Sequence, residues 1–239
     1  MFWLSPCLGY GGSSAPRGVD SYSMETLMSD IRLVIQGLGY SSCVLVSHDW
    51  GGVVAWSFAR FFPDMVDKLI VMNAPSQPSM TKLLKHHKGQ QKNSWYIYFF
   101  QLPLLPELSM SSRNMHCFDS LFGEKSRPGS DPVPAIASSD EIAAYKYTFS
   151  KPGAWTPPIN WYRAAFDVTK KEFQYDMDFQ MPILLIWGIN DTALHIDLVA
   201  QMEKDCPRME VRRIPNVGHF VQIEAPKEVN AIIKDWLNI

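Results

Sequence analysis

Cys43-Val44-Leu45-Val46-Ser47-His48-Asp49-Trp50-Gly51-Gly52 is the stretch that decides the fold of this 239-residue chain. Its apolar start, residues 43–46, predicts a short buried strand. The helix expected to follow runs over residues 52–61 and stops before Pro63. Between the two, small residues flank Asp49 in the pattern small-x-nucleophile-x-small, which is typical of a tight strand-to-helix turn. Such a turn holds its central residue in strained backbone and points the side chain into a site.

The alternation of strand and helix continues on both sides of this turn. Apolar residues recur at helical spacing over residues 24–38, with Ser23 as the N-cap. A last helix is expected to begin at Pro226, because proline is favoured in the first turn of a helix. Further buried strands are expected over residues 68–73 and 182–187, and a shorter strand over residues 211–214. This alternation predicts an α/β fold with a mostly parallel sheet.

The middle of the chain departs from this pattern, since it is rich in proline, methionine and aromatic residues. We therefore expect a first part of the core over 1–75, a helical lid over 76–175 and a second part of the core over 176–239. His195 and Asp197 are interpreted as ordinary polar surface. A basic cluster in the insert is interpreted as a solvated helix face: Lys82, Lys85, His86, His87 and Lys88.

Composition excludes several classes of protein. The net charge is −2, from 22 basic and 24 acidic residues, so no positive field exists to attract nucleic acid or an anionic membrane. The most apolar run, residues 95–105, is too short to span a bilayer and contains Gln101 and Pro103. The opening residues have no basic flank and no long apolar segment, which argues against a signal peptide.

Cysteine usage and the lack of ligand motifs limit the chemistry further. The four cysteines lie far apart without a CxxC pair, which argues against a zinc knuckle or a disulfide framework. That usage suits a reducing intracellular compartment. Because the sequence shows neither a metal-ligand set nor a glycine-rich phosphate loop, we expect no metal and no cofactor.

Asp49 at the centre of the turn determines the expected reaction. A carboxylate does not usefully open an ester, but it can attack a saturated carbon that bears a leaving group, leaving an ester on the protein. Cleavage of that ester needs a base and a group that orients the base. Asp191 follows one expected strand and His219 follows the last one, in the order nucleophile, acid, histidine. Imidazole suits the role of base because its pKa lies near neutrality.

These motifs resemble a known family. His48-Asp49-Trp50-Gly51-Gly52 resembles the HDWGG signature of epoxide hydrolases with the α/β-hydrolase fold. Pro158-Ile159-Asn160-Trp161-Tyr162-Arg163 resembles the lid motif P-(L/I)-N-W-Y-R of that family, and residues 95–103 resemble the segment that bears the other lid tyrosine. The similarity runs from about Gly9 to the C-terminus. It is closest to the animal subgroup whose complete members are anchored in the endoplasmic reticulum membrane.

The resemblance implies roles for further residues. Tyr96 and Tyr162 would donate hydrogen bonds to the epoxide oxygen as the ring opens, with Tyr96 preferred to Tyr98 on resemblance alone. The backbone N–H of Trp50 would bind the oxyanion, and His48 would belong to the same oxyanion and substrate-binding group. The implied partners are a lipophilic epoxide and water, with no cofactor and no metal.

The sequence departs from the family upstream of the turn. Gly9-Tyr10-Gly11 is present, but the HGxP turn that supplies a second oxyanion donor is not. We therefore expect an α/β-hydrolase fold with its N-terminal strands missing and residues 43–47 at an exposed sheet edge. Loss of one oxyanion donor typically costs about 10² to 10³ in rate. A dehalogenase that uses the same aspartate, and an impaired or non-catalytic truncated form, remain alternatives to the epoxide hydrolase.

Overall fold

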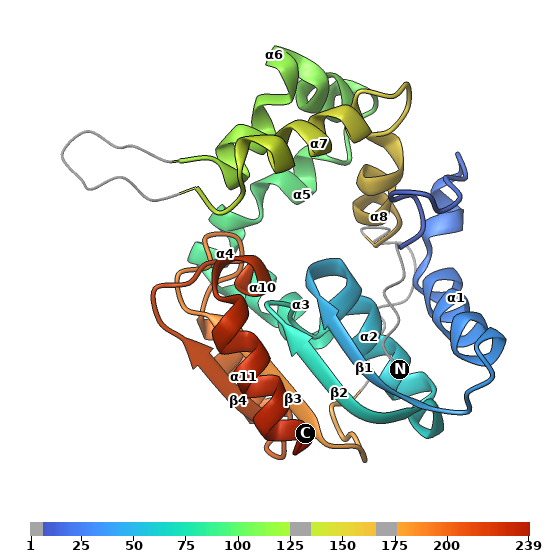
Figure 1. Cartoon of the computed structure of the whole chain (residues 1–239), viewed down its shortest axis with the longest axis vertical. Helices are drawn as coiled ribbons and strands as arrows, with labels where there is room; N and C mark the ends of the chain where they lie inside the picture. Colours follow the sequence, from blue (N-terminus) through green and yellow to red (C-terminus); the bar gives the residue numbers. More distant parts are fainter. Residues whose placement is uncertain (1–6, 125–134, 166–175) are drawn as a thin grey trace. The chain divides into compact units, whose positions relative to one another are not determined.

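The computed structural model describes residues 7–124, 135–165 and 176–239 (Figure 1). Contacts divide the chain into two compact units. The first comprises Met1–Ser23 and Ile97–Asp167, and the second comprises Met24–Tyr96 and Val168–Ile239. Residues 76–96, which the sequence assigns to the lid, therefore group with the sheet, whereas residues 1–23, assigned to the first part of the core, group with the helical insert.

The second unit is built on a parallel sheet of four strands, in the order β1-β2-β3-β4. Leu45 of β1 lies opposite Leu69 of β2, and Met72 of β2 lies opposite Ile186 of β3. The strands are β1 (Cys43–His48), β2 (Val66–Met72), β3 (Ile183–Gly188) and β4 (Glu210–Ile214). Because all four run in the same direction, their carboxyl ends meet at one edge of the sheet, which is where sites form in open α/β sheets.

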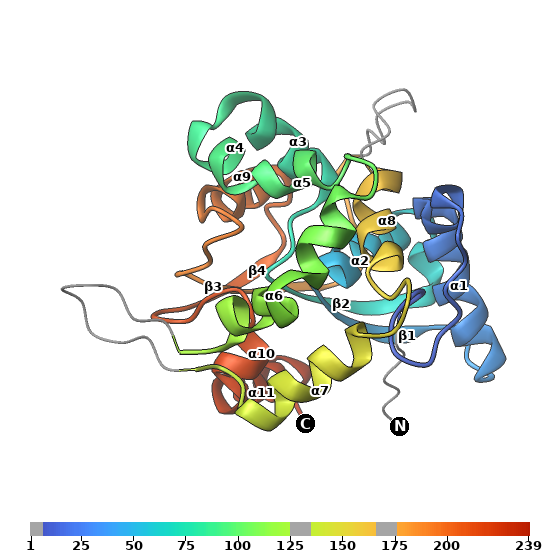
Figure 2. The same ribbon diagram turned by 90° about the horizontal axis from the view of Figure 1, so that it is seen from above.

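Helices cover both faces of the central strands β2 and β3, which are largely apolar on both sides. Alternate residues of β2 and β3, among them Ile70 and Leu184, pack against α10 (Val221–Glu224) and α11 (Pro226–Leu237). On the other face α2 (Asp49–Phe61) brings Gly52 against Val71. Figure 2 shows α10 and α11 on one side of the sheet and α2, α3 (Gln77–His86) and α9 (Asp197–Asp205) on the other.

The remaining helices of this unit extend the α2 side. Helix α1 (Met24–Gly37) packs against α2, and the short 3-10 helix η2 (Pro63–Met65) leads from α2 into β2. Helix α4 (Lys88–Asn93) follows α3 directly. Helix α5 (Trp95–Phe99) contains the point at which the chain passes from the second unit to the first.

The described part of the first unit is helical, as expected for the insert. It contains η1 (Val19–Tyr22), α6 (Leu105–Phe122), α7 (Ser139–Phe149) and α8 (Thr156–Ala165). Helix α7 begins with a capping box between Ser138 and Glu141. Phe118 of α6 stacks on Tyr145 of α7 and on Trp155, which directly precedes α8. Among the described residues, every helix is too short or too polar to cross a membrane.

The α/β class and its parallel sheet are confirmed, and the strands begin or end within two residues of their expected limits. Helix α2 begins at Asp49 and not at Gly52, because the tight turn passes directly into the first helical turn. Strand β1 lies at one end of the described sheet, with Val44 41% and Val46 46% exposed. The described part of the sheet therefore ends in an apolar edge strand, as the sequence predicts.

Candidate active site

Asp49 occupies the turn between β1 and α2 in the backbone conformation that such a turn demands. Its φ is 52°, in the left-handed region that non-glycine residues rarely adopt, whereas His48 before it is extended. A side chain on Gly52 would overlap Ala74, so this glycine allows α2 to approach the end of β2. A Cβ on Gly51 would meet nothing within 4 Å among the described residues, so Gly52 and not Gly51 is the sterically required glycine.

The side chains of Asp49, Asp191 and His219 meet at the carboxyl edge of the sheet. Asp49 follows β1, Asp191 follows β3 and His219 follows β4. Nδ1 of His219 lies 2.7 Å from Oδ2 of Asp191, and Nε2 of the same ring lies 3.1 Å from Oδ2 of Asp49. The imidazole therefore bridges two carboxylates that lie far apart in the sequence.

Asp191 is held by the residues around it. Its side chain is 0% exposed. Oδ1 accepts hydrogen bonds from the backbone N–H groups of Ala193 (2.8 Å) and Leu194 (2.9 Å). Oδ2 accepts a bond of 2.7 Å from the side-chain amide of Asn73. Backbone and amide donors thus compensate the burial of this carboxylate and fix the oxygen that faces His219.

Asn73 is a residue that sequence reasoning missed. It is fully buried at the end of β2, with a positive φ of 36°, and its side-chain oxygen accepts the N–H of Gly188 at 2.9 Å. One side chain therefore connects the ends of β2 and β3 and reaches Asp191. Its place at the end of an expected strand was the available signal.

Glu224 in α10 fixes the loop that carries His219, and it was also not singled out from sequence. Its two carboxylate oxygens accept the N–H groups of Gly218 (2.7 Å) and Phe220 (3.0 Å), on either side of the histidine. At Gly188 a side chain would overlap the carbonyl of Gly218, so the end of β3 and the histidine loop pass in close contact. The position of His219 is thus set by backbone contacts.

The cluster stabilises charge on the histidine. Burial by itself would lower the pKa of His219, but the hydrogen bonds and charges of Asp191 and Asp49 outweigh it and raise the pKa from 6.5 to about 10. Burial would raise the pKa of Asp49, yet its bond to His219 and the neighbouring histidine charges lower the pKa below its ordinary value. Both effects favour an imidazolium between two carboxylates.

His48 and Trp50 flank the candidate nucleophile. Nε2 of His48 donates to the backbone carbonyl of His219 at 2.9 Å, which fixes the tautomer of the ring. Burial, followed by the charge of His219, lowers the pKa of His48, so this ring is neutral. The backbone N–H of Trp50 bonds to the Asp49 carboxylate, which places a donor at the group that would become an ester.

The two expected tyrosines belong to different units. Tyr96 ends the first segment of the second unit, and Tyr162 lies in α8 of the first unit. The ring of Tyr162 packs edge-on against Phe100, with centroids 4.8 Å apart. The structure therefore brings together five of the seven expected site residues, and the role of the tyrosines stays a prediction.

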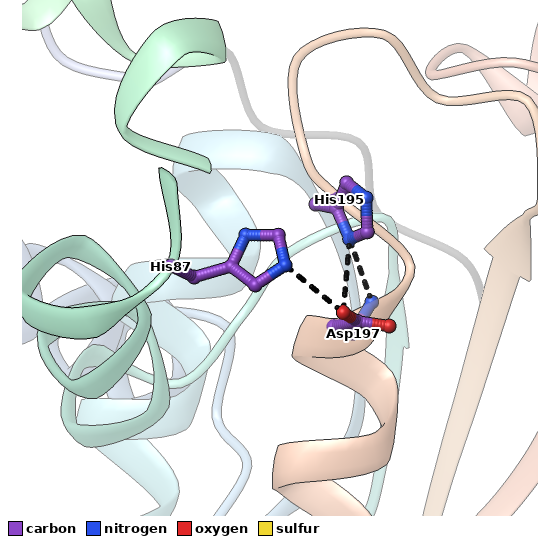
Figure 3. Close-up of side chains that lie close together, drawn as sticks. All are labelled: His87, His195 and Asp197. Atoms are coloured by element: carbon purple, nitrogen blue, oxygen red, sulfur yellow. Dashed lines mark hydrogen bonds and ion pairs between the residues drawn. The ribbon is translucent and has the colours of Figure 1, made fainter. Parts of the chain in front are cut away.

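A second polar cluster consists of His87, His195 and Asp197, which Figure 3 shows. Nε2 of His87 lies 3.0 Å from Oδ2 of Asp197, and Nδ1 of His195 lies 3.5 Å from the same oxygen. The spacing would suit a metal, since the ligand atoms lie within 4.8 Å of one another. However, Nδ1 of His87 accepts the N–H of Gln90 at 3.0 Å, so neutral His87 carries its proton on Nε2, toward Asp197. We therefore describe a hydrogen-bonded cluster that connects the start of α4 with the start of α9.

Known proteins with similar sequences and structures share this architecture. The sequence profile described as alpha/beta hydrolase fold matches residues 7–226. The chain belongs to the α/β-hydrolase fold family. A crystal structure of an epoxide hydrolase from Bacillus megaterium resembles this α/β hydrolase with a TM-score of 0.83 and 32% sequence identity. That match covers 98% of this chain and 82% of the bacterial one.

Relatives of this α/β hydrolase carry the name epoxide hydrolase. Epoxide hydrolase 3 of Xenopus tropicalis is 41% identical over 232 residues, which are 96% of this chain and 62% of the relative. Epoxide hydrolase 1 of Caenorhabditis elegans is 39% identical over 231 residues, covering 96% of this chain and 56% of the relative. The chain thus spans less than two thirds of the length of these two relatives.

Proposed function

We propose that the protein hydrolyses lipophilic epoxides to vicinal diols through an ester on Asp49. The observation that carries the proposal is the hydrogen-bonded series Asp49–His219–Asp191, with a carboxylate and not a hydroxyl in the strained turn. The similarity to proteins named epoxide hydrolases supports the same reaction class. The methionine- and aromatic-rich insert favours a lipophilic substrate.

In the first half of the reaction, an Asp49 oxygen attacks a ring carbon of the epoxide and the carbon–oxygen bond of the ring breaks. The alkoxide that forms needs a proton, which a phenol of Tyr96 or Tyr162 would donate. The imidazolium of His219 then gives up its proton, directly or through water, to restore that phenol. Esterification removes the charge of Asp49. The pKa of His219 then falls from about 10, because one of the two carboxylates that stabilise the imidazolium is gone.

In the second half, neutral His219 takes a proton from water while the water oxygen attacks the carbonyl carbon of the ester. The N–H of Trp50 binds the developing oxyanion, and Asp191 stabilises the imidazolium that forms. Collapse releases the diol and restores the Asp49 carboxylate, with one oxygen from water. The protons balance, because the proton lost by His219 in the first half is regained in the second.

The experiment is to trap the ester. His219→Gln is expected to react with styrene oxide and to accumulate its mass on the peptide that contains Asp49, since the base for the second half is absent. Asp49→Asn is expected to show no added mass, and wild-type protein is expected to turn over to the diol. Wild-type turnover without any trapped adduct in His219→Gln would contradict the covalent mechanism.

Two further measurements separate the alternatives. Release of halide from 1-chlorobutane by wild-type protein, without diol formation from epoxides, would assign the dehalogenase reaction. A folded, monodisperse chain that neither turns over epoxides nor forms an adduct in His219→Gln would assign the non-catalytic alternative. The epoxide hydrolase proposal requires diol formation and an adduct together.

A further inference from the structure

Gln90 is a buried amide in a helix that is otherwise polar. Helix α4 reads KGQQKN, a run typical of a solvated surface, yet Gln90 is 0% exposed. Its Nε2 donates to the carbonyl of Ala193 (3.0 Å) and to Oγ of Ser94 (2.8 Å), and its Oε1 accepts the N–H of His195 at 2.7 Å. These partners fix the orientation of the amide, because a carbonyl needs a donor and an N–H needs an acceptor.

The backbone that Gln90 holds is the loop that holds Asp191. The N–H of Ala193 donates to Oδ1 of Asp191 at 2.8 Å, while the carbonyl of the same residue accepts from Gln90 at 3.0 Å. The N–H of Leu194, the next residue, donates to the same carboxylate oxygen at 2.9 Å. One residue of backbone therefore separates the side chain of Gln90 from the group that orients His219.

A second connection limits movement of the same loop. His87, which caps the start of α4 by accepting the N–H of Gln90, contacts Asp197 at the start of α9 (Figure 3). The loop from Asp191 to His195 thus lies between two fixed points on α4 and α9. The arrangement is more than a helix needs for its own stability, since the amide of Gln90 makes two of its three bonds to this loop.

We propose that Gln90 is a positioning residue that holds the loop of residues 191–195 and so keeps the carboxylate of Asp191 aimed at Nδ1 of His219. Its importance for the reaction rests on the proposed function. Formation of the ester depends on Asp49, whereas cleavage of the ester depends on an imidazole that Asp191 orients. Loss of Gln90 therefore slows the second half of the reaction more than the first.

The test compares Gln90→Met with Gln91→Met. Both variants replace a glutamine of α4 by an apolar side chain of the same length, but Gln91 is exposed, and its side-chain amide donates to the carbonyls of Leu84 and Lys85 in α3 and not to the loop of residues 191–195, as far as the described residues go. The first measurement is the NMR titration of His219 without substrate. In Gln90→Met we expect the midpoint to fall by about one pH unit or more, because Asp191 no longer faces the ring in a fixed orientation. Gln91→Met is expected to titrate as wild type.

The second measurement is single-turnover kinetics with styrene oxide. In Gln90→Met ester cleavage is expected to slow about tenfold or more, with ester formation within about threefold of wild type. An unchanged His219 titration in folded Gln90→Met, or an equal loss of rate in both halves of the reaction, would overturn the proposal.

If Gln90→Met does not fold, Gln90→Glu replaces it, since it keeps the acceptor for His195 but loses the donor to Ala193. In Gln90→Glu the midpoint of the His219 titration must also fall, though by less than is expected for Gln90→Met, and an unchanged midpoint overturns the proposal. If wild-type protein forms no ester, the proposed function fails, while the titration still decides the role of Gln90.

Discussion

Nε2 of His219 lies 3.1 Å from Oδ2 of Asp49, so the proposed base contacts the proposed nucleophile before any substrate arrives. The other nitrogen of the ring is 2.7 Å from Asp191. A ring held between two carboxylates is protonated, and its pKa is raised to about 10. The cluster therefore stores its proton on the histidine at neutral pH, and the histidine becomes a free base only when one carboxylate loses its charge.

Stability should depend on this proton. The folded protein keeps His219 protonated up to about pH 10, whereas the unfolded chain releases that proton near its ordinary value of 6.5. The stabilisation is therefore complete below about pH 6.5 and is lost as pH rises toward 10, because the folded state binds more protons in that window. Urea unfolding at pH 6 to 10 should show a falling free energy of unfolding, by at most about 1.4 kcal/mol per pH unit from this group.

His219→Gln is expected to flatten that slope, and His86→Gln, which removes an exposed histidine of α3, is expected to retain it. If His219→Gln loses stability across the same window as steeply as wild type, another group carries the pH dependence and the imidazolium assignment is wrong.

Adjacent glycines of α2 provide a second prediction. In Gly52→Ala the new methyl group would overlap Ala74 and press on Val71, so overpacking should lower the free energy of unfolding by about 1 to 3 kcal/mol. In Gly51→Ala the methyl group meets no described atom within 4 Å, and alanine is the better helix former, so stability should be unchanged or rise by up to about 1 kcal/mol. Thermal unfolding of both variants measures the difference. Equal effects would show that the approach of α2 to β2 is not the constraint.

The sequence predicted the cluster of Asp49, Asp191 and His219 because each follows an expected strand. In a parallel sheet the ends of all strands reach the same edge, so three local signals become one site without any long-range information. The tight turn added a further local signal, since small residues around Asp49 mark strained backbone. The boundaries of the helices were less predictable, as α2 shows by starting at Asp49 itself.

Among the supporting residues Asn73 lies at the end of an expected strand, but Gln90 and Glu224 carry no such signal. Asn73 and Gln90 act through bonds to groups distant in the sequence, whereas Glu224 binds backbone N–H groups of the loop directly before its helix. Any polar side chain of suitable length could make such bonds, and nothing in local periodicity selects one. Gln90 is the clearest example, because its neighbours in α4 are polar and the helix reads as solvated. His195 and Asp197 read as ordinary surface for the same reason, although the structure places both beside His87.

Asn73, at the end of β2, bonds to both Asp191 and Gly188, so truncation of its side chain should destabilise the protein. Asn73→Ala removes the donor to Asp191 and the acceptor for the N–H of Gly188, and both partners lie in buried surroundings. Leaving buried groups without partners should cost about 2 kcal/mol or more of unfolding free energy. Asn230→Ala, at an exposed position of α11, is the matched control and should be nearly neutral. Chemical denaturation compares the two, and a cost of less than about 0.5 kcal/mol at Asn73 would contradict the structural role.

Glu224 offers the sharpest test of how the histidine loop is held. Its two oxygens accept the N–H groups on either side of His219, and only a carboxylate presents two acceptors at that spacing. Glu224→Gln keeps one acceptor and turns an NH₂ group toward the other N–H, so one backbone donor loses its partner at a cost of about 1 to 3 kcal/mol. Because that donor adjoins the proposed base, cleavage of the Asp49 ester should slow more than its formation, as measured in single-turnover experiments.

The control is Glu228→Gln, the same change at an exposed position in the first turn of α11, which should leave both steps unchanged. Equal behaviour of the two variants would mean that the loop keeps its conformation without Glu224, and that the contacts at Gly188 alone are sufficient to place His219.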